Sequence, residues 1–179
     1  MPDWDVSKVT NMKSAFRTYS TFNADISAWN VSSVTDMNYM FDGATSFNQD
    51  IGDWDVSSVR FMYNMFNEAT TFNQDIDSWD VSSVITMHKM FGGATSFNQN
   101  IGAWDVSSVT TMTKIFDGAT SFNQDISAWK LKPLINLSNM FDNSGLSTEN
   151  YDTFLIHLAS SNLGNDIVLG AIGINYCNG

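Results

Sequence analysis

Apolar residues recur along the chain in two spacings that follow one another. Residues 47–52 alternate between two sets, Phe47, Gln49 and Ile51 against Asn48, Asp50 and Gly52. This period of two predicts a short strand. Farther along, apolar residues three and four apart predict a helix of two or three turns over residues 59–69, at Val59, Met62, Phe66 and Ala69. Each such stretch is therefore predicted to run strand, turn, short helix and loop.

The whole pattern returns every 25 residues. All six tryptophans lie 25 residues apart, at Trp4, Trp29, Trp54, Trp79, Trp104 and Trp129. One phenylalanine per repeat keeps the same step, at Phe16, Phe41, Phe66, Phe91, Phe116 and Phe141. A fixed period of this length is typical of solenoids, in which each unit buries its core against its neighbours.

The predicted fold is an α/β solenoid with one short parallel strand and one short helix per 25-residue coil. Residues 1–146 form the solenoid, in which a truncated unit at 1–21 precedes full units that start at Phe22, Phe47, Phe72, Phe97 and Phe122. Stacking would place equivalent strands about 4.8 Å apart in a parallel sheet. The unpaired edge near residues 22–26 predicts an end-to-end homodimer through the truncated coil.

Residues 147–179 depart from the repeat and are predicted to form a helix–strand cap. Apolar residues at helical spacing predict a helix that begins near Ser147 or Thr148, at Tyr151, Phe154, Leu155, Leu158 and Ala159. Residues 167–169 then predict a strand that pairs with the edge of the last coil. Such a cap would cover an edge that otherwise invites aggregation.

Charge excludes some classes of partner. The chain has 19 Asp and Glu against 8 Lys and Arg, a net charge of −11, so it should repel nucleic acid. Its longest apolar run, residues 167–174, is too short to span a membrane. The single cysteine, Cys177, cannot form a disulfide within the chain, and it leaves the cellular compartment open.

The repeat resembles that of BspA-like leucine-rich-repeat surface proteins of bacteria, whose consensus is close to FNQDISxWDVSSVTNMxxMFxGATS. Residues 122–129 read FNQDISAW and residues 29–47 read WNVSSVTDMNYMFDGATSF. The resemblance implies a right-handed, leucine-rich-repeat-like superhelix, an extracellular or cell-surface location and a role in adhesion. It implies no catalytic residues. Because the chain opens in mid-unit, we expect it to be a fragment of a longer protein.

An asparagine column is the first candidate site: Asn23, Asn48, Asn73, Asn98 and Asn123. One interpretation is an amide ladder, in which stacked side chains satisfy one another and nearby backbone groups. The other is a face that binds a ligand. The next column holds Asp25, Asp50, Asp75, Asn100 and Asp125. These carboxylates either accept hydrogen bonds from turn amides or bind calcium between neighbours, although no DxDxDG motif is present.

Other polar positions give weaker signals. A threonine column fits turn chemistry better than ice binding, at Thr45, Thr70, Thr95 and Thr120. His88 and His157 stand alone, without a partner at metal-ligand spacing or a nucleophile motif, so we expect no enzyme and no metal site. The most variable columns are assigned to the solvent-exposed side of the helices. They include Thr35, Arg60, Ile85 and Thr110, and Tyr39, Asn64, Lys89 and Lys114.

Two functions fit these features of the sequence. The first is an extracellular adhesion module that presents the Asn and Asp columns to a protein or glycan. The second is a structural spacer in a larger surface protein.

Overall fold

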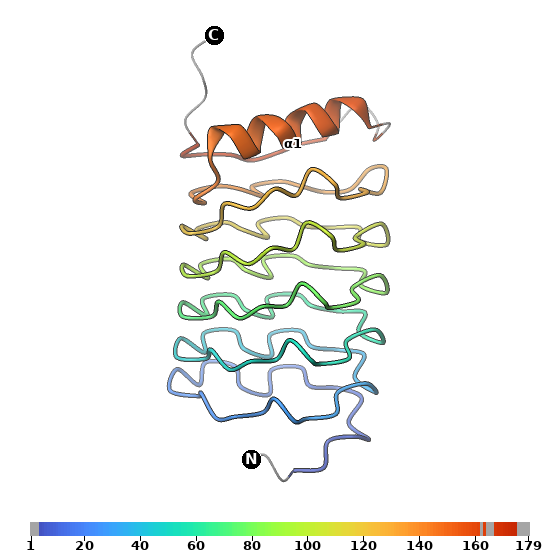
Figure 1. Ribbon diagram of the computed structural model, residues 1–179, viewed down its shortest axis with the longest axis vertical. Helices are drawn as coiled ribbons and strands as arrows, with labels where there is room; N and C mark the ends of the chain where they lie inside the picture. The colour runs from blue at the N-terminus through green and yellow to red at the C-terminus, as the bar shows by residue number, and fades with distance from the viewer. Residues whose placement is uncertain (1–3, 162, 164–166, 175–179) are drawn as a thin grey trace.

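The computed structural model describes residues 4–161, 163 and 167–174. Figure 1 shows a stack of coils that ends in one helix, α1 (Thr148–Ser160). Equivalent residues of successive coils face one another in parallel bridges, which join Asn11, Asp36, Phe61, Thr86, Thr111 and Asn136 in order. The 25-residue period of the sequence is therefore the length of one coil.

The helix expected in each repeat does not form, and that prediction is wrong: α1 is the single helix within the described ranges. Residues 62–69 form successive turns whose N–H groups alternate in direction. Those of Asn64, Phe66 and Glu68 donate to the next coil, at His88, Met90 and Gly92, over 2.9, 2.9 and 2.7 Å. The intervening ones donate to the carbonyl three residues earlier, from Met65, Asn67 and Ala69. An α-helix would direct all of them to its own preceding turn.

Left-handed backbone at two positions per coil keeps these turns from becoming a helix. The first position has φ between 53° and 60° and is occupied by Ser14, Tyr39, Asn64, Lys89, Lys114 and Asn139. The second is occupied by Thr18, Gly43, Glu68, Gly93, Gly118 and Asn143. A run of overlapping β-turns brings apolar side chains inward every three or four residues, as a helix does, so the apolar spacing alone could not separate the two.

The strand expected at residues 47–52 also differs from what is observed. The backbone bridge between coils falls at Phe61 instead, as an isolated pair. At the predicted strand, the side chain of Asn23 takes the place of a backbone carbonyl and accepts the N–H of Asn48 at 2.9 Å. Phe47 and Ile51 are buried there and the residues between them are not, so the segment has an inward side without a strand ladder.

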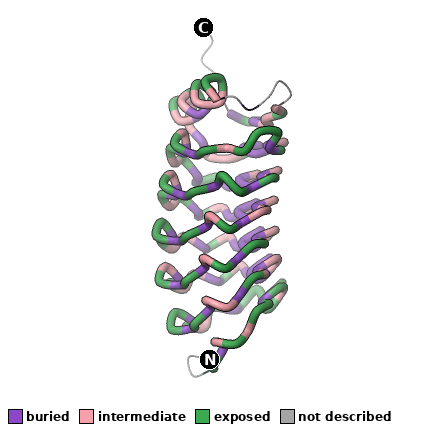
Figure 2. The backbone as a smooth tube through the Cα atoms, turned by 90° about the vertical axis from the view of Figure 1, so that its right-hand side faces the viewer, coloured by how far each residue is buried: buried purple, intermediate pink, exposed green. Residues whose placement is uncertain are grey.

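Phenylalanine and tryptophan columns form the core. Figure 2 shows that buried positions recur in every coil of the stack. Within one coil the two phenylalanine rings stack, as at Phe91 and Phe97, whose centroids are 3.9 Å apart. Buried indole N–H groups donate to the carbonyl of an isoleucine 28 residues earlier, from Trp54, Trp79, Trp104 and Trp129 over 2.9 to 3.2 Å. Aromatic packing thus ties each coil to its neighbours.

Helix α1 and residues 167–174 cover the C-terminal end of the stack. The Ser147 hydroxyl caps α1 by accepting the N–H of Asn150 at 3.3 Å. Past the helix, Leu169 forms a parallel bridge with Leu137. The N–H groups of Phe141 and Asn143 donate to the carbonyls of Gly170 and Ile172 at 2.9 and 2.6 Å. Two outward N–H donors of the last coil, those of Phe141 and Asn143, are therefore occupied. Cys177 lies outside the described residues.

The N-terminal end of the stack exposes backbone carbonyl acceptors, whereas the last coil directs N–H donors outward. Carbonyls of residues 36, 38, 40 and 42 accept N–H groups from the first coil, and the equivalent carbonyls of residues 11, 13, 15 and 17 have no donor among the described residues. A symmetric end-to-end pair would set these carbonyls against one another. The homodimer remains a prediction, and apolar contacts around Trp4, 60% exposed, would have to hold it.

Candidate functional site

The asparagine column forms a ladder between coils. Each side-chain oxygen accepts the backbone N–H of the next member, over 2.8 to 2.9 Å, at Asn48, Asn73, Asn98 and Asn123. The last oxygen accepts the N–H of Ser147 at 2.8 Å. Glutamine amides reinforce the ladder, since Gln99 Nε2 lies 2.9 Å from both the Asn73 carbonyl and Asn73 Oδ1. These amide oxygens are already engaged within the molecule.

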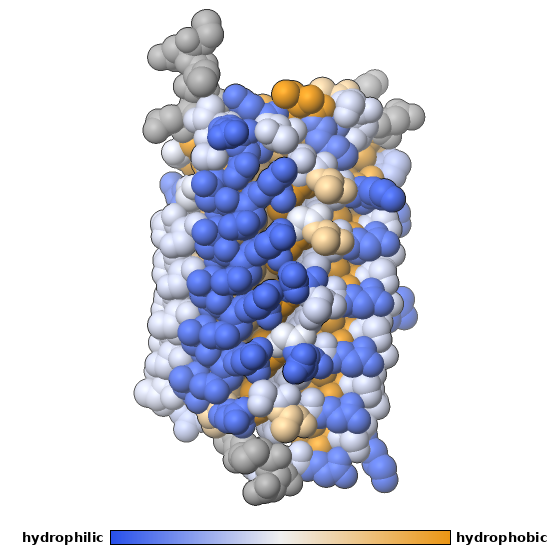
Figure 3. All heavy atoms as spheres, in the orientation of Figure 1, coloured by the Kyte–Doolittle hydropathy of each residue, from blue (hydrophilic) through white to orange (hydrophobic). Residues whose placement is uncertain are grey.

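The aspartate column is arranged differently. Each member uses one side-chain oxygen to accept the N–H two residues later, at Ser27, Gly52, Asp77, Gly102 and Ser127, over 2.8 to 3.0 Å. All five side chains are exposed. In each carboxylate a second oxygen remains for an external partner. Figure 3 shows hydrophilic side chains gathered in columns along this face of the stack.

Hydrogen bonds keep carboxylates on this face ionised. The backbone N–H of Ser27, followed by its hydroxyl, lowers the pKa of Asp25, and Ser127 lowers the pKa of Asp125 in the same way. A neighbouring column repeats the arrangement. There a serine hydroxyl is the main cause of the lowered pKa, at Asp5, Asp55 and Asp105.

These lowered pKa values predict acid-sensitive stability. A carboxyl whose pKa is lower in the folded state stabilises the fold above its unfolded pKa of about 4, and that contribution is lost as the pH falls through the folded value. We expect the urea midpoint of unfolding to decrease when the pH is lowered from 5 to 3. The decrease should be smaller in a variant that carries Asp25→Asn and Asp125→Asn. An equal fall in both proteins would contradict a role for these two turns.

Calcium binding can be tested on the same column. Within the ranges that the structure describes, no three or more His, Cys, Asp or Glu side chains are grouped so as to hold a metal ion. We expect the same melting temperature by circular dichroism in EDTA and in millimolar calcium. A rise of several degrees in calcium would contradict this, because a ligand that binds the native state stabilises it.

The remaining candidates lie apart from these columns. Threonine hydroxyls donate to the preceding coil's carbonyls over 3.2 to 3.5 Å, from Thr45, Thr70, Thr95 and Thr120. His157 Nε2 lies 2.9 Å from the Trp129 carbonyl, so it fastens α1 to the last coil. His88 lies against the ring of Tyr63, with centroids 4.5 Å apart. Burial and two lysines lower the pKa of His88.

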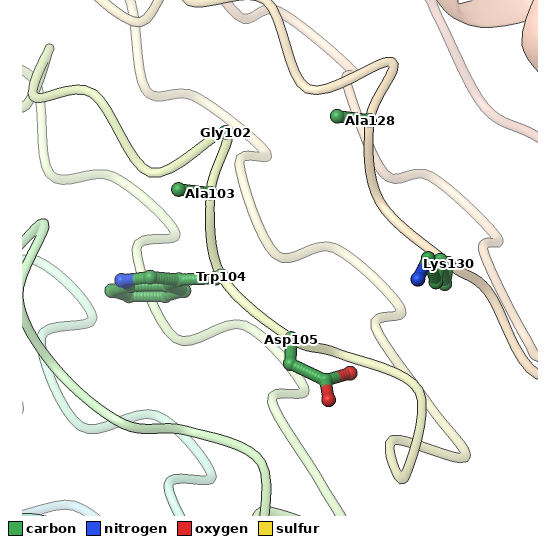
Figure 4. A pocket seen from close by; sticks show the side chains of 6 residues that line it. All are labelled: Gly102, Ala103, Trp104, Asp105, Ala128 and Lys130. Atoms are coloured by element: carbon green, nitrogen blue, oxygen red, sulfur yellow. The ribbon is translucent and has the colours of Figure 1, made fainter.

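One hollow lies beside the column that contains Asp5, Asp55 and Asp105. It has a volume of about 210 Å³ and is lined by Gly102, Ala103, Trp104, Asp105, Ala128 and Lys130. Figure 4 shows the Trp104 ring turned away from Asp105 and Lys130. Lys130 stands where the other units have Asp or Asn, and its charge contributes to the lowered pKa of Asp105.

One cluster was not predicted from the sequence. Tyr39 belongs to a column that was assigned to solvent, yet its ring lies against that of Tyr63 at a tilt of 46°, and the Tyr63 ring stacks on His88. The sequence did contain a signal for this cluster: these positions hold aromatic side chains, whereas equivalent positions of other units hold Asn, Thr or Ser.

Comparison with known proteins places the repeat in a family. The family model described as "Mycoplasma protein of unknown function, DUF285" matches residues 1–95 and 74–158. No curated protein and no solved structure matches the chain. In the part of the chain that the structure describes, no helix has the length and apolar character needed to cross a membrane. The two matched segments together cover the whole repeat array, and the chain belongs to the DUF285 family.

Proposed function

We propose that this chain is a non-catalytic binding module that serves adhesion at a cell surface. The resemblance to BspA-like repeats supports that location and the right-handed, leucine-rich-repeat-like solenoid, both of which are part of the proposal. The observation that carries it is the aspartate column. Its carboxylates are exposed and hydrogen-bonded through one oxygen, whereas the asparagine oxygens beside them are engaged between coils.

Repetition explains how weak contacts could give useful affinity. A single exposed ion pair is worth about 0–1 kcal/mol. The carboxylates recur once per coil on a framework that the asparagine ladder keeps in register. A partner that engages several of them gains from linked binding events. We expect this partner to be a protein or glycan with cationic or amide groups.

The experiment neutralises the column without disturbing its turns. Asn100 occupies the same column and accepts the Gly102 N–H at 3.0 Å, so asparagine is compatible with this turn. The test variant carries Asp25→Asn, Asp50→Asn, Asp75→Asn and Asp125→Asn. Its binding is compared with that of the wild type on an array of purified extracellular-matrix proteins and glycans. We expect affinity for the wild-type ligands to fall about tenfold or more, as roughly 1.4 kcal/mol requires.

The neighbouring column supplies a matched control. Asn30 there accepts the N–H of Ser32 at 3.1 Å, so asparagine again keeps the turn. The control variant replaces four aspartates of this column by asparagine, at Asp5, Asp55, Asp80 and Asp105, so it loses the same amount of negative charge as the test variant. An equal loss of affinity in both variants would mean that net charge alone causes the effect, and it would contradict the proposal.

The spacer function makes a different prediction. Deleting residues 72–96 removes one repeat and keeps the register of the others. A spacer would lose function in the longer protein on this deletion while the charge variants behave as wild type. An adhesion module would respond to the charge variants.

A further inference from the structure

A row of side chains in contact runs along the stack through four successive coils. The Arg17 guanidinium carbon lies 4.6 Å from the centre of the Tyr39 ring. The Tyr39 and Tyr63 rings are 5.1 Å apart, and Tyr63 and His88 are 4.5 Å apart at an interplanar angle of 18°. We call Arg17, Tyr39, Tyr63 and His88 the aromatic row.

The aromatic row lies on the opposite side of the coil from the aspartate column. Phe41 belongs to the segment that carries Tyr39, and Phe47 belongs to the segment that carries Asp50. Their buried rings stack at 3.9 Å in the core. Because both segments direct phenylalanine inward, their outward side chains point to opposite sides. The row is therefore separate from the proposed adhesive face.

Charge is distributed unequally between these two sides. The segments that carry the aromatic row and its equivalents are residues 10–18, 35–43, 60–68, 85–93, 110–118 and 135–143. They hold five of the eight Lys and Arg residues, Lys13, Arg17, Arg60, Lys89 and Lys114. They hold five of the nineteen acidic residues, Asp36, Asp42, Glu68, Asp117 and Asp142. These segments therefore carry no net charge, and all of the chain's excess negative charge lies elsewhere.

Some of these cations are free to meet a ligand. Arg17 pairs with Asp42 at 2.9 Å, and Lys114 lies 3.7 Å from Asp117 in a half-buried pair. Lys89 and Arg60 have no carboxylate within 4.0 Å among the described residues. Both Lys89 and Lys114 lie close enough to His88 to lower its pKa, so the end of the row has a positive environment.

The stacking itself favours anions. The Tyr63 and His88 rings cover one another's faces and leave their edges outward, and the edge of an aromatic ring carries the positive part of its quadrupole. Threonines occupy neighbouring columns: Thr86 adds a hydroxyl, and Thr111 and Thr113, whose hydroxyls lie 3.0 Å apart in a hydrogen bond, leave one hydroxyl proton between them for a ligand. The apolar contribution is small, from Phe61 and the half-buried Ile85. A protein interface normally has a larger apolar centre.

We propose that the aromatic row, with Lys89 and Lys114, binds a linear anionic polysaccharide that lies along the stack. The row repeats once per coil in the direction of the stack, which suits a chain-like ligand with regularly spaced charges. Carboxylated and sulfated sugars share the required chemistry. This site goes beyond the adhesive function proposed above and does not depend on it.

Isothermal titration tests the proposal with the whole chain at low ionic strength. The probes are a carboxylated and a sulfated linear polysaccharide, with poly-glutamate as the acidic polypeptide. The test variant carries Lys89→Gln and Lys114→Gln, and the control carries Lys130→Gln and Lys132→Gln, which make the same charge change at two exposed lysines elsewhere. We expect about tenfold weaker polysaccharide binding in the test variant alone.

A second readout separates a binding role from a structural one. An anion at the row should raise the pKa of His88, measured by NMR with and without saturating polysaccharide. An unchanged His88 pKa would overturn the proposal, as would absent wild-type binding or equal losses in both lysine variants. Equally tight binding of poly-glutamate would also overturn it and identify an acidic protein as the partner. The four-fold Asp→Asn variant should retain polysaccharide binding, so this site can fail or succeed independently of the adhesive face.

Discussion

Replacing Phe91 by alanine should lower the free energy of unfolding by about 3–5 kcal/mol, measured by urea denaturation. Phe91 is fully buried, and its ring stacks on Phe97 at 3.9 Å within the coil. It also faces Phe66 at 5.8 Å and Phe116 at 5.9 Å in the coils on either side. The cavity would therefore remove contacts from three coils at once.

Leu134→Ala provides the control for this prediction. Leu134 is 79% exposed, so its truncation should change stability by no more than about 0.5 kcal/mol. If Phe91→Ala does not fold, Phe91→Leu gives a milder version of the same test. A loss below about 1 kcal/mol in Phe91→Ala would show that the aromatic column is not what joins the coils.

Displacing the C-terminal cap should convert the protein into one that associates end to end. A Cβ atom on Gly170 would lie 2.3 Å from the Asn139 Cα and 2.5 Å from its backbone nitrogen. Gly170→Ala should therefore push residues 169–172 away from the last coil and expose the N–H groups of Phe141 and Asn143. The N-terminal end offers carbonyls of the opposite polarity, so copies should join head to tail.

Sedimentation velocity over a range of concentrations would detect this association. We expect larger species in Gly170→Ala than in wild type, growing with concentration. Ile172→Ser changes an exposed side chain of the same segment and should sediment as wild type does. If Gly170→Ala and wild type sediment alike at every concentration, the cap does not protect the edge.

Much of the architecture could be predicted because it depends on repetition. Identical spacing of Trp, Phe and Asn indicates which residues lie above one another, and the interpretation of the asparagine column as a ladder agrees with its hydrogen bonds. The helix could not be predicted correctly, since Val59, Met62 and Phe66 have inward spacing that suits both a helix and a run of turns. The two structures differ in the acceptor of each backbone N–H. The N–H of Asn64, for example, donates to His88 in the next coil, a partner that the spacing within one unit does not reveal.

The candidate site was predictable to a lesser extent. Exposed aspartates at one position per coil are visible in the sequence, and so is the serine or glycine that completes most of the turns. The aromatic row was not found because Tyr63 and His88 occupy equivalent positions in different units, where the repeats differ from one another. Their stacking appears only when the coils are placed in contact.

The most direct test of the adhesive role compares binding by three proteins: wild type, the four-fold Asp→Asn variant and the Lys89→Gln, Lys114→Gln variant. Each is titrated with a matrix ligand that wild type binds on the array and with the anionic polysaccharide. We expect the aspartate variant to lose the matrix ligand and the lysine variant to lose the polysaccharide. Wild-type affinity of the aspartate variant for every matrix ligand would contradict the adhesive role and favour a spacer.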